Sequence, residues 1–137
     1  MNASEPITQI MTTDIITVSA DSKLSEVRQL MADNGIHHMP VMNGRRLLGI
    51  ISYADILELS FTDFVSDPTI RDEVLDERCT VAELMNSTII TVSDRATIRH
   101  AARALSSGRI HSVPVVDGKG HLKGMVTSTD LIRYLLD

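Results

Sequence analysis

Segments 49–55 and 124–130 contain the same ordered set of residues: a glycine, two apolar residues, a serine or threonine, two further residues and an aspartate. They read Gly49-Ile50-Ile51-Ser52-Tyr53-Ala54-Asp55 and Gly124-Met125-Val126-Thr127-Ser128-Thr129-Asp130, and each follows a β-like run and opens a helix-like run. The start of a helix presents free N–H groups and a partial positive charge, which suit an anion such as phosphate. An aspartate in the first helical turn can accept hydrogen bonds from a sugar diol. The two motifs together predict two sites for a nucleotide-like ligand.

The same spacing also has a purely structural interpretation. Ser/Thr-x-x-Asp at the start of a helix is a variant of the capping box, which stabilises the helix without binding anything. Two copies in matching frames, each with a glycine three residues upstream, favour the ligand interpretation. The two roles are compatible because an N-cap hydroxyl can also face a ligand, so the sequence leaves both open.

The composition narrows the class of partner. The net charge is −5 with the histidines neutral, and aromatic residues make up 3% of the chain. A nucleic-acid binder would show a basic face and stacking aromatic rings, so that class is excluded, whereas a small anionic ligand is not. No apolar run is long enough for a membrane span, and the first residues do not resemble a signal peptide. We expect a cytoplasmic protein that binds neither nucleic acid nor a membrane.

An internal repeat organises the chain. The run Ile15-Ile16-Thr17-Val18-Ser19 returns unchanged as Ile89-Ile90-Thr91-Val92-Ser93, and Pro40-Val41 returns as Pro114-Val115. We assign residues 1–59 to the first repeat with its N-terminal segment, 60–79 to a linker and 80–137 to the second repeat. Because one repeat is too short to bury a good core, the two are expected to form one module.

Each repeat predicts the same elements. The periodicity and the turn residues predict a helical turn, a short strand, a helix, two strands around an Asn-Gly or Asp-Gly turn, and a final helix. In the first repeat these are residues 7–11, 16–18, 23–34, 39–42, 47–51 and 53–59; in the second they are 81–85, 90–92, 95–107, 113–116, 122–126 and 128–136, with a short linker helix near 70–77. The expected fold class is α+β: two βαββα repeats related by a pseudo-two-fold, with their sheets packed together and helices outside.

The order of these motifs, with His-x-x-Pro-Val before the turn and Gly-x-x-Ser/Thr-x-x-Asp before the last helix, resembles the CBS domain family. Two copies resemble the tandem CBS pair, or Bateman module, and the chain is similar to small stand-alone bacterial CBS domain proteins. The resemblance implies a non-catalytic, energy-sensing regulatory module. It would bind AMP, ADP, ATP or S-adenosylmethionine in the cleft between the repeats and require no other cofactor.

The resemblance also implies which residues bind the ligand. One site would combine Thr17, His38 and Pro40 with Thr127 and Asp130, and the other Thr91, Ser112 and Pro114 with Ser52 and Asp55. The aspartates would hold the ribose. Backbone groups of Ile16, Ile36, Ile90 and Ile110 would line the slot, and the phosphate candidates are His37, His38, His111, Arg109 and Lys123.

Other classes of function are weighed against this one. A nucleophile needs a base and an orienting group, and no such set is visible, so we expect no enzyme activity. The histidines lack the spacing of a metal site, so none is expected. A homodimer through the helices and an unidentified protein partner are expected. The alternatives are a structural adaptor between proteins with vestigial ligand sites, and a cleft for a metal, nicotinamide or guanine ligand.

Overall fold

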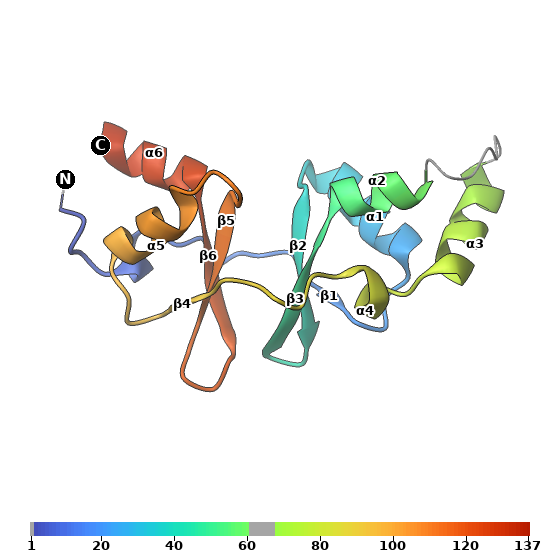
Figure 1. Ribbon diagram of the computed structural model, residues 1–137, viewed down its shortest axis with the longest axis horizontal. Helices are drawn as coiled ribbons and strands as arrows, with labels where there is room; N and C mark the ends of the chain where they lie inside the picture. The colour runs from blue at the N-terminus through green and yellow to red at the C-terminus, as the bar shows by residue number, and fades with distance from the viewer. Residues whose placement is uncertain (1, 61–67) are drawn as a thin grey trace. The chain divides into compact units, whose positions relative to one another are not determined.

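The computed structural model describes residues 2–60 and 68–137, so the loop predicted within 61–67 lies outside the described residues (Figure 1). The chain forms two compact units. The central unit comprises residues 16–44 and 48–89, and the C-terminal unit comprises residues 1–15, 45–47 and 90–137. Among the described residues, no helix is both long and apolar enough to cross a membrane.

The central unit contains a three-stranded sheet with strand order β1-β2-β3, in which β1 runs parallel to β2 and Val18 lies opposite Val41. Helix α1 connects β1 to β2 in the sequence, and helices α2, α3 and α4 follow β3. The elements are β1 (Val18–Ser19), α1 (Leu24–Asn34), β2 (His38–Asn43), β3 (Arg46–Ser52), α2 (Tyr53–Ser60), α3 (Pro68–Arg78) and α4 (Val81–Leu84), the first residues of β3 being grouped with the other unit.

The C-terminal unit repeats this plan with strand order β4-β5-β6, where β4 is parallel and β6 antiparallel to β5. Its elements are the 3-10 helix η1 (Ile7–Gln9), β4 (Val92–Ser93), α5 (Ile98–Leu105), β5 (Ser112–Val116), β6 (Leu122–Thr127) and α6 (Ser128–Leu136). Two small mixed sheets with helices confirm the predicted α+β class and its two repeats.

Several boundaries differ from the predicted ones for local reasons. The helix predicted at 95–107 is only Ile98–Leu105, because Thr97 is its N-cap and its amide donates to Nδ1 of His100 at 3.1 Å. The short strands begin at Val18 and Val92, each two residues later than predicted. The linker helix is longer than predicted, and α1 ends at Asn34 as predicted, with Gly35 as its left-handed C-cap at a φ of 62°.

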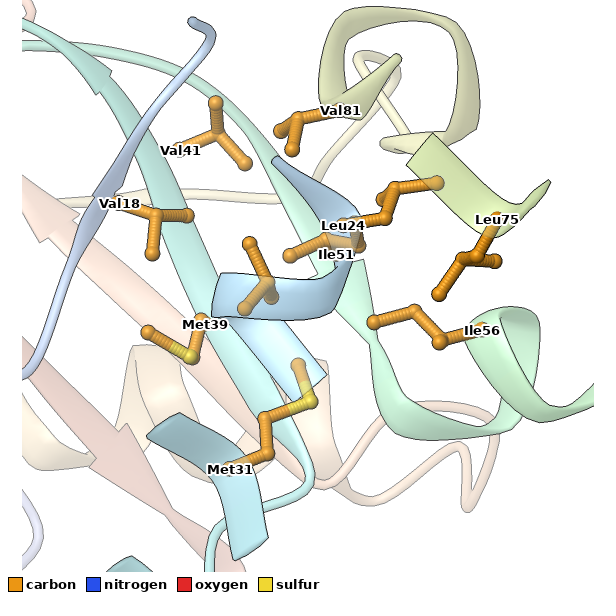
Figure 2. Close-up of a cluster of buried hydrophobic side chains, with 10 residues drawn as sticks. Val18, Leu24, Met31, Met39, Val41, Ile51, Ile56, Leu75 and Val81 are labelled. Carbon is orange, nitrogen blue, oxygen red and sulfur yellow. The ribbon is translucent and has the colours of Figure 1, made fainter. Parts of the chain in front are cut away.

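Aliphatic and methionine side chains fill the core of the central unit (Figure 2). Met39, Val41 and Ile51 of the sheet share one cluster with residues of α1, and all three are fully buried. Leu75 of α3 joins the same cluster, so the linker helix is part of this core. Aromatic side chains are scarce in this chain, and the flexible side chains of Met31 and Met39 occupy space in the core.

Helix α3 also caps α1. The carboxylate of Asp76 accepts hydrogen bonds from the Ser25 amide at 2.9 Å and from its hydroxyl at 2.6 Å. The N-cap residue of α1, Lys23, makes no side-chain hydrogen bond to the helix start. Asp76 of the linker therefore accepts the hydrogen bond from the Ser25 amide that an N-cap side chain usually accepts. An ion pair between Arg28 and Asp72 adds a second contact between the two helices.

The N-terminal segment packs with the second repeat. Ile7 is fully buried in the core of the C-terminal unit, and its amide donates to the Ala96 carbonyl at 2.9 Å. The Ile98 amide donates to the Glu5 carbonyl, also at 2.9 Å. The compact units therefore differ from the sequence repeats, since residues 1–15 belong to the first repeat in sequence but fold with the second.

The motif glycines lie where another chain segment crosses the sheet. Thr12 and Met125 exchange two backbone hydrogen bonds of 2.8 and 2.9 Å beside Gly124, and Ile50 and Asn86 exchange two of 2.8 and 3.0 Å beside Gly49. A Cβ at Gly124 would lie 2.9 Å from the carbonyl oxygen of Thr12. A side chain at either glycine would therefore collide with the crossing backbone.

We expect Gly124→Ala to destabilise the protein by about 1–3 kcal/mol, the usual cost of overpacking. The flexible Met11 side chain can shift away from the new Cβ. The Thr12 carbonyl cannot shift as easily, because it accepts a hydrogen bond from the Met125 amide. Urea unfolding measures the change. Gly118→Ala is the matched control, because a Cβ there meets nothing within 4 Å. Equal unfolding free energies for the two variants would contradict the close approach.

Candidate functional site

In the C-terminal unit the candidate residues of the second repeat gather at one end of the sheet. Ser112 of β5 lies directly opposite Thr127 of β6. The Ser128 amide, at the start of α6, donates to the carbonyl of His111 at 3.0 Å. The loop before β5 and the start of α6 therefore adjoin, and this group of residues is called the C-terminal half-site.

The central unit holds the equivalent arrangement, called the central half-site. The Tyr53 amide, at the start of α2, donates to the carbonyl of His37 at 2.7 Å. The rings of His37 and Tyr53 meet edge to face, with their centroids 5.8 Å apart. Tyr53 was not predicted as a site residue, although its place directly after Ser52 was a usable signal. Its counterpart in the other half-site is Ser128, so the two half-sites differ.

The Ser/Thr-x-x-Asp motifs make the capping bonds that the sequence left open. The Asp55 amide donates to Oγ of Ser52 at 3.2 Å, and the Asp130 amide donates to Oγ1 of Thr127 at 3.1 Å. In return, Oδ2 of Asp130 accepts from the Thr127 amide at 2.8 Å. A carboxylate has two oxygens and about four acceptor positions, so capping leaves it able to accept further hydrogen bonds.

Apolar side chains border both half-sites. Ile16 is 36% exposed and Ile90 is 57% exposed, which is unusual for large aliphatic residues. Each isoleucine precedes an exposed threonine, Thr17 or Thr91, in the loop that leads to a short strand. The prolines of β2 and β5 are buried, whereas Ile36, Ile110 and Ser112 are half-buried. An exposed apolar surface beside hydroxyls suits a flat, partly polar ring such as a nucleobase.

The phosphate candidates divide into two groups. His37, His38, His111 and Arg109 are exposed and lie in or beside the loops that lead to β2 and β5. Lys123 is a correction: it lies at the start of β6, whereas Thr127 ends that strand. The strand rises about 3.3 Å per residue, so Lys123 lies away from the C-terminal half-site of its own unit.

The described residues offer no group of three or more histidine, cysteine, aspartate or glutamate side chains placed to hold a metal ion. Cys79 packs partly against the core of the central unit. Burial raises the pKa of its thiol, and nearby Glu83 adds to that effect. A raised pKa lowers the thiolate fraction, so Cys79 lacks the activation of a nucleophilic cysteine.

The structure thus brings together the residues that each repeat contributes, one half-site per unit. The predicted pairing of the loop of one repeat with the aspartate of the other stays a prediction. In each half-site, one helix start, one capping hydroxyl and one carboxylate adjoin exposed polar and apolar loop residues. Such a set can bind a sugar and an anion together with a flat ring.

Comparison with known proteins agrees with this arrangement. A family model of the CBS domain matches residues 7–61 and 81–137. The crystal structure of protein MJ1225 from Methanocaldococcus jannaschii shares 26% identity, covering 98% of this chain and 49% of that one, with a TM-score of 0.84. The CBS domain pair of protein MJ0100, in complex with 5-methylthioadenosine and S-adenosyl-L-methionine, shares 25% identity, covering 95% of this chain and 98% of that one, with a TM-score of 0.75.

Relatives of this chain differ in length. The CBS domain-containing protein DDB_G0289609 of Dictyostelium discoideum is 29% identical, with 95% of this chain and 90% of that protein covered. The chain spans 48%, 32% and 22% of three other curated relatives, which include an inosine-5'-monophosphate dehydrogenase. The same pair of repeats therefore also occurs within longer proteins, and the expected bacterial origin stays a prediction.

Proposed function

Because this chain belongs to the CBS domain family, we propose that it is a regulatory module that binds an adenosine-containing ligand such as AMP, ADP, ATP or S-adenosylmethionine. The observation that carries the proposal is the duplicated half-site. In both units the start of a helix is hydrogen-bonded to the loop before the central strand, at 2.7 Å in one and 3.0 Å in the other. Two separately built copies of one polar arrangement favour a binding role over a chance cap.

The choice of ligand follows from chemistry and from one relative. The capping aspartates can accept hydrogen bonds from both hydroxyls of a ribose, and the positive end of the helix dipole at each helix start favours an anion. The related MJ0100 pair binds two adenosine derivatives. We therefore assign the ribose to Asp55 and Asp130 and the base to the loops that contain Thr17 and Thr91.

The phosphate group distinguishes the possible ligands. Arg109 and His111 flank Ile110 in the C-terminal half-site, and both are exposed. The matching positions before β2 are Gly35 and His37, so the central half-site lacks the arginine. We propose that Arg109 and His111 hold the phosphate of a nucleotide. A ligand without phosphate would depend on them less.

Regulation requires that the ligand bind two conformations of the protein with different affinity. We propose that ligand binding alters the contacts of this module with a second copy of itself or with another protein. Exposed Ile132, Leu135 and Leu136 on α6 give a homodimer an apolar surface. Gel filtration with and without the ligand would report such a change in association.

The first experiment is a thermal-unfolding screen with AMP, ADP, ATP, S-adenosylmethionine, NAD, GMP and Mg²⁺. A ligand at 100 times its dissociation constant stabilises the folded state by about 2.7 kcal/mol. That stabilisation raises the midpoint of a domain this size by roughly 3–6 °C. A rise with adenosine compounds supports the proposal. Unchanged midpoints with all of them at millimolar concentration would contradict it.

One observation favours a second candidate, an adaptor between proteins with vestigial ligand sites. The reciprocal bonds between Thr127 and Asp130 form a complete capping box. The motif therefore has a structural use without any ligand. An adaptor would show no thermal shift in the screen, and losing the cap would only reduce its stability.

A further inference from the structure

A cavity of about 770 Å³ lies beside the loop that joins β5 to β6. It is lined by Arg45, Asp117, Gly118, Lys119, His121, Leu122 and Lys123, and all seven belong to the C-terminal unit. This hairpin pocket adjoins the end of β5, whereas Ser112 of the C-terminal half-site starts that strand. Five residues of strand span about 15 Å, so the two sites are separate.

The charge of the hairpin pocket is opposite to that of the whole chain. Arg45, Lys119 and Lys123 carry permanent positive charges, and Asp117 supplies the one carboxylate of the lining. The chain as a whole has a net charge of −5. A local excess of two positive charges on an acidic protein gives a positive potential at this point, and that potential attracts anions.

Backbone hydrogen bonds hold Arg45 against the hairpin. The Leu122 amide donates to the Arg45 carbonyl at 3.1 Å, and the Leu47 amide donates to the Gly120 carbonyl at 3.2 Å. Arg46 and His121 form an antiparallel bridge between these bonds. The arginine thus comes from the first repeat and the lysines from the second, and replacing their side chains leaves these backbone bonds intact.

Asp117 fixes the loop that presents the lysines. Its Oδ1 accepts from the Lys119 amide at 2.9 Å and from the His121 amide at 3.0 Å. The bond from the His121 amide, together with the nearby charges of His121 and Lys123, holds the pKa of Asp117 below its ordinary value. Gly120 completes the turn with a φ of 79°. Lys119 therefore stands on a preorganised loop directly before the strand that carries Lys123, which lowers the entropic cost of binding.

We propose that the hairpin pocket is a second ligand site, which binds a small anion with several phosphate groups, of the pyrophosphate or polyphosphate class. Arginine offers a planar fork to phosphate oxygens, and each lysine offers a mobile point charge. The volume lies within the roughly 300–1,000 Å³ of small-molecule sites. Three separated cations suit a multivalent anion better than a carboxylate. An acidic protein segment would also need apolar contacts in the pocket. Leu122 is the one large apolar side chain among the seven lining residues, so the pocket offers few such contacts.

Calorimetric titration with inorganic pyrophosphate tests the proposal. Changing Arg45, Lys119 and Lys123 together to glutamine is expected to weaken binding roughly 30-fold, at about threefold for each exposed charge. The matched control changes Arg95, Arg99 and Arg103 to glutamine, which removes the same charge from exposed positions outside the pocket. The control is expected to weaken binding less than threefold. Asp117→Asn keeps an acceptor for the loop and should tighten binding about threefold.

A further variant separates this pocket from the proposed adenosine site. Arg109→Gln with His111→Gln removes any pyrophosphate binding at the C-terminal half-site, and the binding that the triple change at Arg45, Lys119 and Lys123 weakens is expected to remain. Loss of all pyrophosphate binding in the Arg109 and His111 variant would overturn the assignment. Absence of binding at millimolar pyrophosphate, equal losses in the two triple variants, or binding of an acidic glutamate peptide in place of pyrophosphate would each overturn it as well. None of these outcomes depends on whether an adenosine ligand binds.

Discussion

Replacing Asp130 by alanine, together with Asp55, is expected to weaken binding of the adenosine ligand at least tenfold while the protein stays folded. Hydrogen bonds to a charged group contribute about 1.5–3 kcal/mol each, and 1.4 kcal/mol corresponds to a tenfold change in affinity. If the aspartates serve only as caps, the same change costs about 0.5–1.5 kcal/mol of stability and no affinity. The two roles therefore predict different measurements on one pair of variants.

Titration calorimetry with the ligand found in the thermal screen gives the affinity, and urea unfolding gives the stability. Asp55→Ala and Asp130→Ala measured singly show which half-site the ligand occupies, and the double variant covers both. Asp130→Asn retains an oxygen acceptor for the Thr127 amide, so it should keep much of the cap while losing the charge-assisted bonds to ribose.

The chain contains a matched control for the loss of a cap. Thr80 and Glu83 form a capping box at the start of α4, in which the Glu83 amide donates to Oγ1 of Thr80 at 3.1 Å. Glu83→Ala removes the carboxylate of a comparable cap that contains no residue of either half-site, and it should leave ligand affinity unchanged. If the double aspartate variant binds as tightly as Glu83→Ala does, the aspartates do not hold ribose.

Local signals in the sequence were enough for most of the fold. The turn residues before and after each strand, the helical spacing of Leu24, Val27 and Met31, and the capping box at Thr80 each act within a few residues. The predicted helix at 128–136 is confirmed, and α4 begins at a complete capping box formed by Thr80 and Glu83. The duplication doubled each signal, so that a weak pattern in one repeat was supported by its copy in the other.

Contacts between distant segments had no such signal. The sequence shows a glycine at position 124 but not the backbone of Thr12 that crosses beside it. It shows an aspartate at 76 in a charged linker but not that this carboxylate caps α1. Lys123 was grouped with the phosphate candidates for its charge alone, although the strand predicted at 122–126 already separates it from Thr127. Residue types predict chemistry, whereas long-range packing decides where that chemistry takes place.

The N-terminal segment gives the clearest case, and it leads to the second large effect. Ile7→Ala is expected to destabilise the protein by roughly 2–4 kcal/mol, the usual cost of truncating a buried aliphatic side chain. Ile7 is fully buried, and its cluster includes Ala101, Val113 and Val126 of the second repeat. The cavity would therefore open in the C-terminal unit, although residue 7 belongs to the first repeat in the sequence.

Urea unfolding measures the loss, and Thr8→Ala, at an exposed position in the same 3-10 helix, is the control. Native-state hydrogen exchange locates it. Local openings report the stability of their own region. The increase in amide exchange rate caused by Ile7→Ala should therefore be at least as large in β5 and β6 as in β2. A loss no larger than that of Thr8→Ala, or faster exchange confined to β2, would show that residues 1–15 contribute nothing to the C-terminal unit. The expected result would mean that a module cut to begin at the first strand lacks part of the core of its second repeat.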